Sequence, residues 1–387
     1  MIYSAQFYFF FALTGSVLYW IIPESFYRLR YALILLCSFV LVYSAYPYAA
    51  LLACAVTVLA WAICQLGERP GMEKYHGPLP FLIFLPLVTL DWADLAGSFD
   101  IAPKALFTFG LSYYTLKLFG SIRIAWAASN RSFAAFLSTA LFFPAFPAGP
   151  IDYHASFSRD VIASPFDARL YLSGILRFGS GVLKLYVISD FFTDLLDDMT
   201  VRGDLGQVAW SEMAAGLAYL ACLVKFLSLY FNFSGYTDIA IAIGRLFGFR
   251  LSENFHFPLL SYNIQNFWQR WHLSLSRFVS RFIFLPMVRR TGRPVMAIFI
   301  AFVLVGIWHE FSPNYLIWGI GHGAALAFLM ARNDRKKKAP PLVTLRDYGL
   351  RGLSIWLTVS YVAILSTFAN EPGLDAGGRL LLSLIGL

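Results

Sequence analysis

Charge is what this sequence has least of: Asp, Glu, Lys and Arg make up 13% of its 387 residues, whereas apolar residues make up 59%. A water-soluble domain carries roughly 25% charged residues, which cover its surface. The deficit excludes a soluble domain, an intrinsically disordered chain and a nucleic-acid-binding module. The chain therefore has lipid as its solvent and its first expected partner, and we expect no nucleic-acid partner.

Cysteine is also scarce. The four cysteines lie in or beside apolar runs, without the spacing of a metal site or a disulfide framework. They are expected to pack as small apolar side chains, and no metal site is predicted. Residues 1–23 lack a basic stretch and a small-residue cleavage pattern and are long enough to span a bilayer, so we expect them to be retained.

Three common catalytic motifs are absent as well. His309 and Glu310 do not continue into a His-Glu-x-x-His zinc motif, because residue 313 is proline. The sequence also contains no Gly-x-Ser-x-Gly elbow and no phosphate-binding loop of the Gly-x-x-x-x-Gly-Lys type. Zinc proteases, serine hydrolases and nucleotide-driven pumps thus lose their usual signatures.

Long apolar runs are abundant, and a run of roughly 17–25 residues can cross a bilayer as a helix. We expect about eleven transmembrane or re-entrant helices, near residues 3–22, 31–46, 48–66, 79–97, 104–127, 133–148, 169–193, 208–231, 295–312, 315–331 and 344–368. Glycine and proline interrupt several runs, including Pro86, Gly110, Pro144 and Pro147. Broken helices at membrane depth need protein or a cavity around them. The sequence predicts an all-α polytopic membrane protein, one membrane-embedded domain over residues 1–387 with an internal cavity.

Basic residues indicate the orientation of two of these runs. The clusters at residues 289–293 and 332–338 flank two consecutive apolar runs, and short basic loops favour the cytoplasm. The chain between them should turn near Glu310–Asn314 and return. His309 would then lie about 24 Å of helix away from Arg293, deep in the membrane or toward its outer side.

The segment 251–293 is too polar to span and is expected to be re-entrant or interfacial. On a continuous helix, Arg270, Arg277 and Arg281 would share one face, and His272 would lie about 200° from Arg270. The basic stripe would contact lipid headgroups, or the phosphates of an acyl donor; it consists of Arg270, Arg277, Arg281, Arg289 and Arg290. The histidine would face the protein interior.

Ionisable side chains at membrane depth are costly and are therefore functional candidates. His309 ends an apolar run, where a neutral imidazole could accept a proton from a hydroxyl, or simply bond a carbonyl group. His272, between aromatic neighbours, could position a substrate or another histidine, or be structural. His322, between two glycines near the middle of its run, is expected in a close helix contact. Asp238 could pair with Arg245 or with an arginine of the polar segment, or cap a helix.

Several stretches together resemble the membrane-bound O-acyltransferase family, and the earlier ones are similar to its bacterial members. The stretches are FNFSGYTDIA (231–240), ENF (253–255), NFWQRWHLSLS (266–276), GIWH (306–309), GLSYY (110–114), FPAFPAGPI (143–151) and GVLK (181–184). The resemblance implies many helices around a central tunnel or funnel, in which a cytoplasmic acyl thioester reaches an acceptor hydroxyl on the other side. The family's catalytic histidine falls on His309 and its second histidine on His272. His309 would be the general base, and His272 would orient or polarise the reactants.

With this resemblance, the remaining site residues follow as expectations. Arg270, Arg277, Trp268 and Trp271 are expected at the acyl donor, and Asp238, Tyr236 and His322 along the substrate path. The donor would be acetyl-CoA or the thioester of an acyl carrier protein, with no permanently bound cofactor. The acceptor would be an extracytoplasmic glycan or a relay partner, and the location a bacterial inner membrane.

Two subgroups of the family fit different features. The stretch 234–240 looks more like alginate O-acetyltransferases, whereas the length of 387 residues is nearer to the D-alanyl transfer protein of teichoic acid modification. Glu310 and Asn232 depart from the family's pattern, which leaves the acyl group and the acceptor open. Acetyl transfer to a polysaccharide is our first expectation, and D-alanyl or other acyl transfer is the alternative. A small-molecule or lipid transporter is the alternative from another class, because broken helices around buried polar groups are also typical of transporters. An export-complex scaffold is a third.

Overall fold

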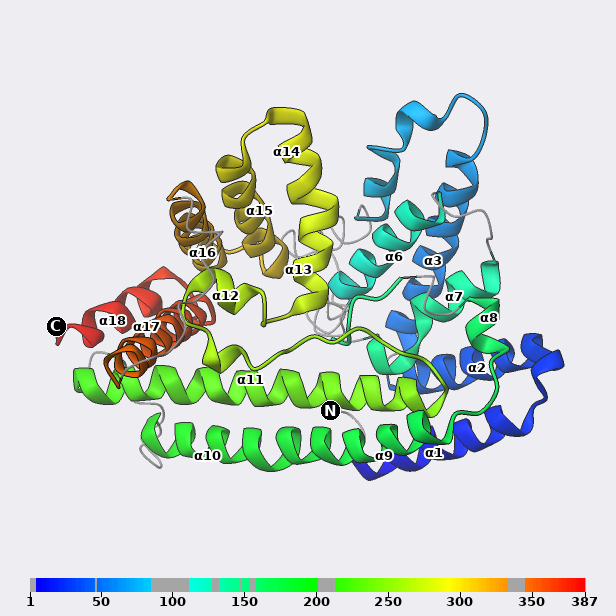
Figure 1. Cartoon of the computed structure of the whole chain (residues 1–387), viewed down its shortest axis with the longest axis horizontal. Helices are drawn as coiled ribbons and strands as arrows, with labels where there is room; N and C mark the ends of the chain where they lie inside the picture. Colours follow the sequence, from blue (N-terminus) through cyan, green and yellow to red (C-terminus); the bar gives the residue numbers. More distant parts are fainter. Residues whose placement is uncertain are drawn as a thin grey trace. The chain divides into compact units, whose positions relative to one another are not determined.

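The fold is helical wherever the structure describes it. The structure is a computed structural model that describes residues 5–45, 47–84, 111–126, 132–146, 148–153, 158–200, 210, 213–332 and 345–386. Within those ranges no residue lies in a β-strand (Figure 1), which confirms the predicted all-α class. Pro86, Gly110, Pro147 and most of the basic cluster 332–338 lie outside the described residues.

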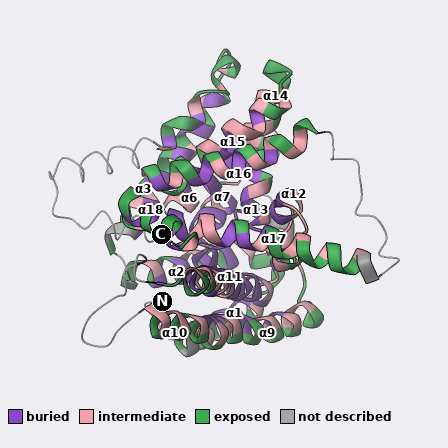
Figure 2. Ribbon diagram, turned by 90° about the vertical axis from the view of Figure 1, so that its left-hand side faces the viewer, coloured by how far each residue is buried: buried purple, intermediate pink, exposed green. Residues whose placement is uncertain are grey.

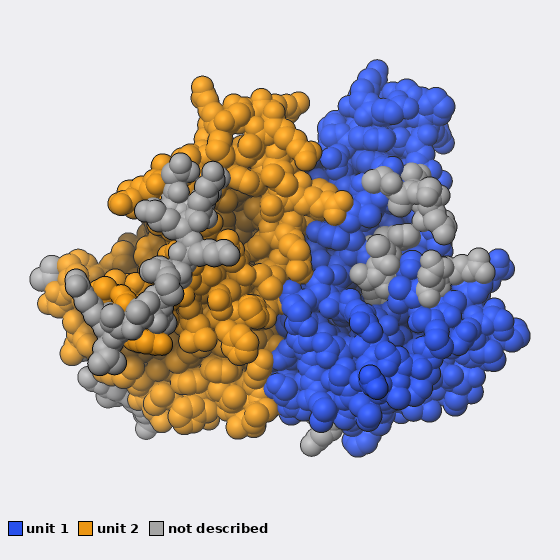
Figure 3. Space-filling model, viewed as in Figure 1, with its two compact units in different colours: residues 1–182, 235–253 blue, residues 183–234, 254–387 orange. Residues whose placement is uncertain are grey.

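The contacts of the chain divide it into two compact units, coloured in Figure 3. Unit 1 comprises residues 1–182 and 235–253, and unit 2 comprises residues 183–234 and 254–387. Two long helical stretches, Ala168–Thr200 and Ala215–Leu246, each contribute to both units. The single membrane-embedded domain expected from the sequence stays a prediction.

Unit 1 is built from helices of the first half of the chain and the C-terminal part of α11 (Ala215–Leu246). Its other helices are α1 (Ala5–Ile21), α2 (Tyr27–Ala45), α3 (Pro47–Gly67), α6 (Leu111–Ala125), α7 (Phe133–Leu141), α8 (Arg159–Ile162) and α9 (Ala168–Leu183). Glycines bring α9 close to α11. A Cβ atom on Gly181 would lie 2.8 Å from the carbonyl oxygen of Gly235, and one on Gly174 would lie 2.9 Å from that of Ala242.

Unit 2 holds the remaining helices and the N-terminal part of α11. They are α10 (Ser189–Thr200), α12 (Ile264–Trp268), α13 (Leu273–Val279), α14 (Leu285–Thr291), α15 (Pro294–His309), α16 (Pro313–Ala331), α17 (Leu345–Ala369) and α18 (Leu374–Leu384). π-helical segments precede α10 (Lys184–Ile188) and join α13 to α14 (Ser280–Phe284). The chain turns between α15 and α16 at residues 310–312, where the sequence predicted a turn.

Six helices in the described part of the chain are long and apolar enough to cross a membrane. They are Glu24–Ser44, Ala50–Gly67, Ala168–Thr200, Ala215–Leu246, Pro313–Ala331 and Asp347–Ala369. Two shorter apolar helices, Phe9–Ile21 and Pro294–His309, add to them. These helices support a multi-pass membrane protein, but they do not confirm the expected number of about eleven. The expected span at 133–148 contains only the nine-residue α7 and then a 3-10 turn at Phe143–Ala145, where Pro144 has no N–H to continue a helix.

Exposed apolar side chains on α9 and α10 indicate that these helices are in contact with lipid. On α9, α10 and the π-helical segment between them, five large apolar side chains at helical spacing are more than half exposed: Leu172, Leu176, Leu183, Val187 and Phe191. Figure 2 shows exposed residues along both of these helices. In water such a stripe would be an unusually large apolar patch, whereas in lipid it carries no cost.

Glycines also set the distance between α15 and α16. A Cβ atom on Gly306 would lie 2.3 Å from the carbonyl oxygen of Tyr315, one on Gly319 would lie 2.7 Å from that of Phe302, and one on Gly323 would lie 2.9 Å from that of Phe299. Small residues of this kind let two membrane helices approach backbone to backbone. The close contact expected around His322 is thereby confirmed.

We expect Gly319→Ala to lower the free energy of unfolding by about 1–3 kcal/mol, because the added methyl group overpacks this contact. The matched control is Gly179→Ala on α9, where nothing lies within 4 Å of the added Cβ. There alanine should be neutral or stabilising by up to about 1 kcal/mol, since it favours helix over glycine. Thermal unfolding of both variants in detergent measures the difference, and equal melting temperatures would contradict the close contact.

Candidate active site

The chain leaves its helical path just before His272. The helix α12 ends at Trp268, His272 has a left-handed backbone (φ 45°), and α13 begins at Leu273. The reason is pairing with a distant segment: the N–H of Leu273 donates to the carbonyl of Asn254 and the N–H of His256 donates to the carbonyl of Arg270, both at 2.9 Å. The prediction of one helix with its arginines on a shared face is therefore wrong, because the break separates Arg270 from the helix that follows.

Asn254 holds the ring of His272. Its side-chain Oδ1 accepts hydrogen bonds from the backbone N–H of Ser274 (3.1 Å) and from the Ser274 hydroxyl (2.7 Å). The Nδ1 atom of His272 lies 3.2 Å from the same oxygen. Because this oxygen can only accept, Nδ1 must donate, and in a neutral imidazole the other nitrogen, Nε2, is then an acceptor. Phe233 packs edge-on against the ring at 4.9 Å, so the orientation of the imidazole is fixed as well.

His309 is the accessible histidine of this group. It ends α15, and its side chain is exposed. The rings of Tyr315 and Trp318 lie 5.6 and 5.4 Å from its own. His309 also interacts electrostatically with His272, which is 2% exposed. Both predicted catalytic histidines thus lie in unit 2, within the range of an electrostatic interaction.

His322 joins the same group from α16. It is fully buried, its ring lies 4.6 Å from that of Trp318, and it interacts electrostatically with His309. The indole N–H of Trp268 donates to its Nδ1 atom at 3.3 Å. Trp268, expected at the acyl donor, therefore holds His322, and Trp318 packs against two histidines at once.

The other residues expected at the acyl donor differ in how far their side chains are exposed. Trp271 is 9% exposed and packs among aromatic rings, with Phe226, Phe255 and Phe267 between 5.0 and 5.5 Å away. Arg270 donates to the carbonyl of His256 at 3.3 Å, and Arg277 is exposed. Their part in donor binding stays a prediction.

Asp238 and Tyr236 lie in unit 1, on the C-terminal part of α11. Two guanidinium nitrogens of Arg177 donate to Oδ1 of Asp238, at 2.7 and 2.9 Å. Arg245, the expected partner, lies 3.6 Å from Glu253 and also interacts electrostatically with Asp238. The helix-cap alternative is wrong, because α11 runs uninterrupted through Asp238. The hydroxyl of Tyr236 donates to the carbonyl of Pro144 at 2.7 Å.

Three residues that hold the site in place were not predicted. Asn254 belonged to a matched stretch, but nothing in the sequence links it to His272. Trp318 was one aromatic residue among many. Arg177 could have been found, because a charge in the middle of an apolar run needs a partner. Across the described residues, no three His, Cys, Asp or Glu side chains are grouped closely enough to hold a metal ion.

Comparisons with known proteins give three kinds of relative. A peptidoglycan O-acetyltransferase of Helicobacter pylori is 29% identical over 66% of this chain and 48% of its own length. A probable alginate O-acetylase of Pseudomonas syringae is 30% identical over 72% of this chain and 52% of its own. A teichoic acid D-alanyltransferase of Streptococcus thermophilus is 28% identical over 75% of each chain. The chain thus spans about half the length of the first two relatives.

The profile of the membrane-bound O-acyltransferase family matches residues 75–339, about two thirds of the sequence. That range includes all the residues that build the histidine group and most of both units. The apolar helices of the fold agree with it. The chain therefore belongs to the membrane-bound O-acyltransferase family.

Proposed function

We propose that this protein is an O-acyltransferase of a bacterial inner membrane that moves an acetyl group from a cytoplasmic thioester to a hydroxyl group outside the cytoplasm. One observation carries the proposal: His309 is exposed at the end of α15, and it interacts electrostatically with the buried His272, whose tautomer Asn254 sets. Proton transfer of this kind needs a base that the substrate can reach, and a second group that accepts a hydrogen bond from the base and so orients it.

The proposed reaction uses the two nitrogens of His309 differently. One nitrogen takes the proton of the acceptor hydroxyl, whose oxygen attacks the thioester carbonyl. The new C–O bond forms, the C–S bond breaks, and the proton passes from the imidazole to the departing thiolate. The other nitrogen must carry a hydrogen throughout, and in the proposed complex Nε2 of His272, which the bond to Asn254 leaves as an acceptor, would take that hydrogen bond. His272 would thus orient His309. It would not polarise the thioester carbonyl, because Nε2 of His272 carries no hydrogen to donate to the carbonyl oxygen.

The names of the relatives support the substrate class. Two of them are named for O-acetylation, of peptidoglycan and of alginate, and we therefore propose an extracytoplasmic polysaccharide, or a relay protein that serves it, as the acceptor. Acetyl-CoA is the donor that this choice favours. Arg270 and Arg277 would meet its phosphates, with Trp268 and Trp271 behind them, and Asp238, Tyr236 and His322 would lie along the substrate path.

A second candidate is D-alanyl transfer from an acyl carrier protein. It is favoured by the D-alanyltransferase of Streptococcus thermophilus, whose match covers 75% of both chains. The chemistry at His309 would be the same, because both donors are thioesters. Purified protein offered each thioester in turn separates the two candidates.

We expect His309→Gln to lower the acceptor-dependent release of thiol by about 10²–10⁴-fold, the usual contribution of a general base. The assay uses purified protein in liposomes with acetyl-CoA or an acyl carrier thioester. His256→Gln is the matched control, because His256 is an exposed histidine of the same unit. Unchanged turnover in His309→Gln would refute the base. A solute that crosses the liposomes while no thioester is consumed would instead establish a transporter.

A second prediction concerns Asn254. We expect Asn254→Ala to lower kcat by about 10–100-fold, because His272 loses the acceptor that sets its tautomer. Asn254→Asp keeps an acceptor oxygen and should retain more activity than the alanine variant. In a His309→Gln background, Asn254→Ala should cause little further loss, since both act on one base. If the double variant instead lost kcat by the product of the two single losses, Asn254 would act independently of His309, for example on folding. Melting temperatures of the variants would reveal an effect on folding.

A further inference from the structure

One stretch within the family match, residues 254–333, is almost free of negative charge. Between residues 254 and 333 the sequence has one acidic residue, Glu310, and seven arginines: 270, 277, 281, 289, 290, 293 and 332. Glu310 follows the C-terminal end of α15, whereas Arg293 immediately precedes its N-terminal end. One end of α15 is therefore purely cationic.

Three of these arginines lie together at that end. Arg289 and Arg290 are in the last turn of α14, and Arg293 caps the start of α15. All three are exposed, and within the part of the chain that the structure describes none of them has an acidic partner. Unpaired arginines next to a membrane helix attract anionic headgroups, with about 1 kcal/mol for each charge.

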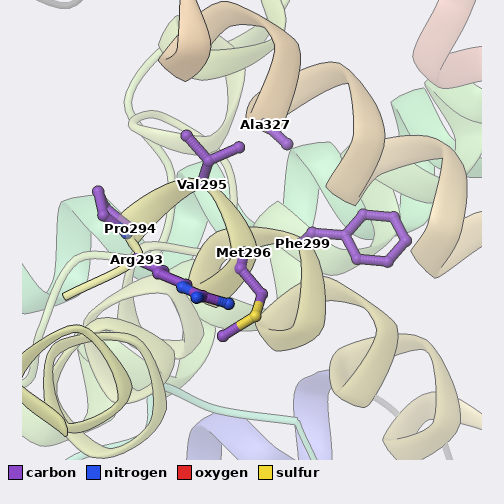
Figure 4. A pocket seen from close by; sticks show the side chains of 6 residues that line it. All are labelled: Arg293, Pro294, Val295, Met296, Phe299 and Ala327. Atoms are coloured by element: carbon purple, nitrogen blue, oxygen red, sulfur yellow. The ribbon is translucent and has the colours of Figure 1, made fainter. Parts of the chain in front are cut away.

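An apolar groove begins at the same point (Figure 4). It has a volume of about 550 Å³ and is formed by Arg293, Pro294, Val295, Met296, Phe299 and Ala327. Apart from the arginine, every lining side chain is apolar. In the figure the guanidinium group of Arg293 lies beside the side chain of Met296. The groove is open at the surface, where a membrane helix meets lipid tails.

We propose that this groove binds one anionic phospholipid, with its phosphate at Arg290 and Arg293 and an acyl chain along Met296, Phe299 and Ala327. The apolar lining selects a hydrocarbon chain, and the unpaired arginines select a negative headgroup. Only an amphiphile satisfies both. From Phe299 to His309 is ten residues, or about 15 Å of helix, so the groove is separate from the candidate active site and the proposal does not rest on the proposed function.

The test compares two phospholipids with identical acyl chains, phosphatidylglycerol and phosphatidylcholine, added to the purified full chain in a nonionic detergent. Bound lipid is counted by native mass spectrometry, and the dissociation constant is measured by titration. We expect phosphatidylglycerol to bind at least about fivefold more tightly, from the single charge that distinguishes the headgroups. Equal binding of the two lipids would overturn the proposal.

Variants separate the headgroup from the chain. Arg290→Gln and Arg293→Gln should each weaken phosphatidylglycerol binding by about fivefold, whereas Arg281→Gln, outside the groove, should not. Met296→Trp, which fills the groove, should weaken binding of both lipids, and Leu304→Trp, on an exposed position of α15, should not.

Glycerol phosphate alone should not compete. If it competes fully, the arginines bind free phosphate, and if Met296→Trp raises the KM of the thioester without affecting lipid, the groove belongs to the donor. Either result overturns the proposal.

Discussion

Polar groups at membrane depth must find their partners inside the protein, and this requirement organises both units. In unit 1 Arg177 binds Asp238 and also donates to both oxygens of Glu253, at 2.5 Å each. In unit 2 a single oxygen of Asn254 serves His272 and Ser274. Glu253 and Asn254 are consecutive in the chain. Glu253 accepts hydrogen bonds from Arg177, and the next residue, Asn254, accepts one from the buried His272. A buried group without such partners would cost several kcal/mol.

The histidines depend on packing as much as on hydrogen bonds. The glycines of α15 and α16 allow their backbones to touch, and this contact brings Trp318 against both His309 and His322. A larger residue at Gly319 would move α16 away from α15 and carry Trp318 with it. The geometry of the site is therefore set by residues that have no side chain, and Gly306 is less than one helical turn away from His309.

Local patterns in the sequence were sufficient for part of this structure. The scarcity of charge predicted the helical membrane fold, and the two basic clusters predicted the turn after His309. Long-range pairing accounts for what was missed. The break before His272 is caused by backbone bonds to residues 254–256, and the partner of Asp238 is Arg177, 61 residues earlier in the chain. Helical periodicity carries no information about such long-range contacts, so the sequence pattern predicted one helix through Arg270 and His272. The predicted apolar run also ended near residue 231, although α11 continues to Leu246. Beyond residue 231, Tyr236 and Asp238 have partners within unit 1.

The different roles proposed for the two histidines follow from their surroundings. His272 is almost fully buried, and its Nδ1 hydrogen is committed to Asn254, so it cannot meet a large acceptor such as a glycan. His309 is exposed at the end of its helix, where an acceptor hydroxyl can approach. A neutral imidazole has one N–H and one lone pair, and a base must keep the lone pair for its substrate. In the proposed reaction the N–H of His309 would need an acceptor, and the bond from His272 to Asn254 leaves Nε2 of His272 able to accept a hydrogen bond.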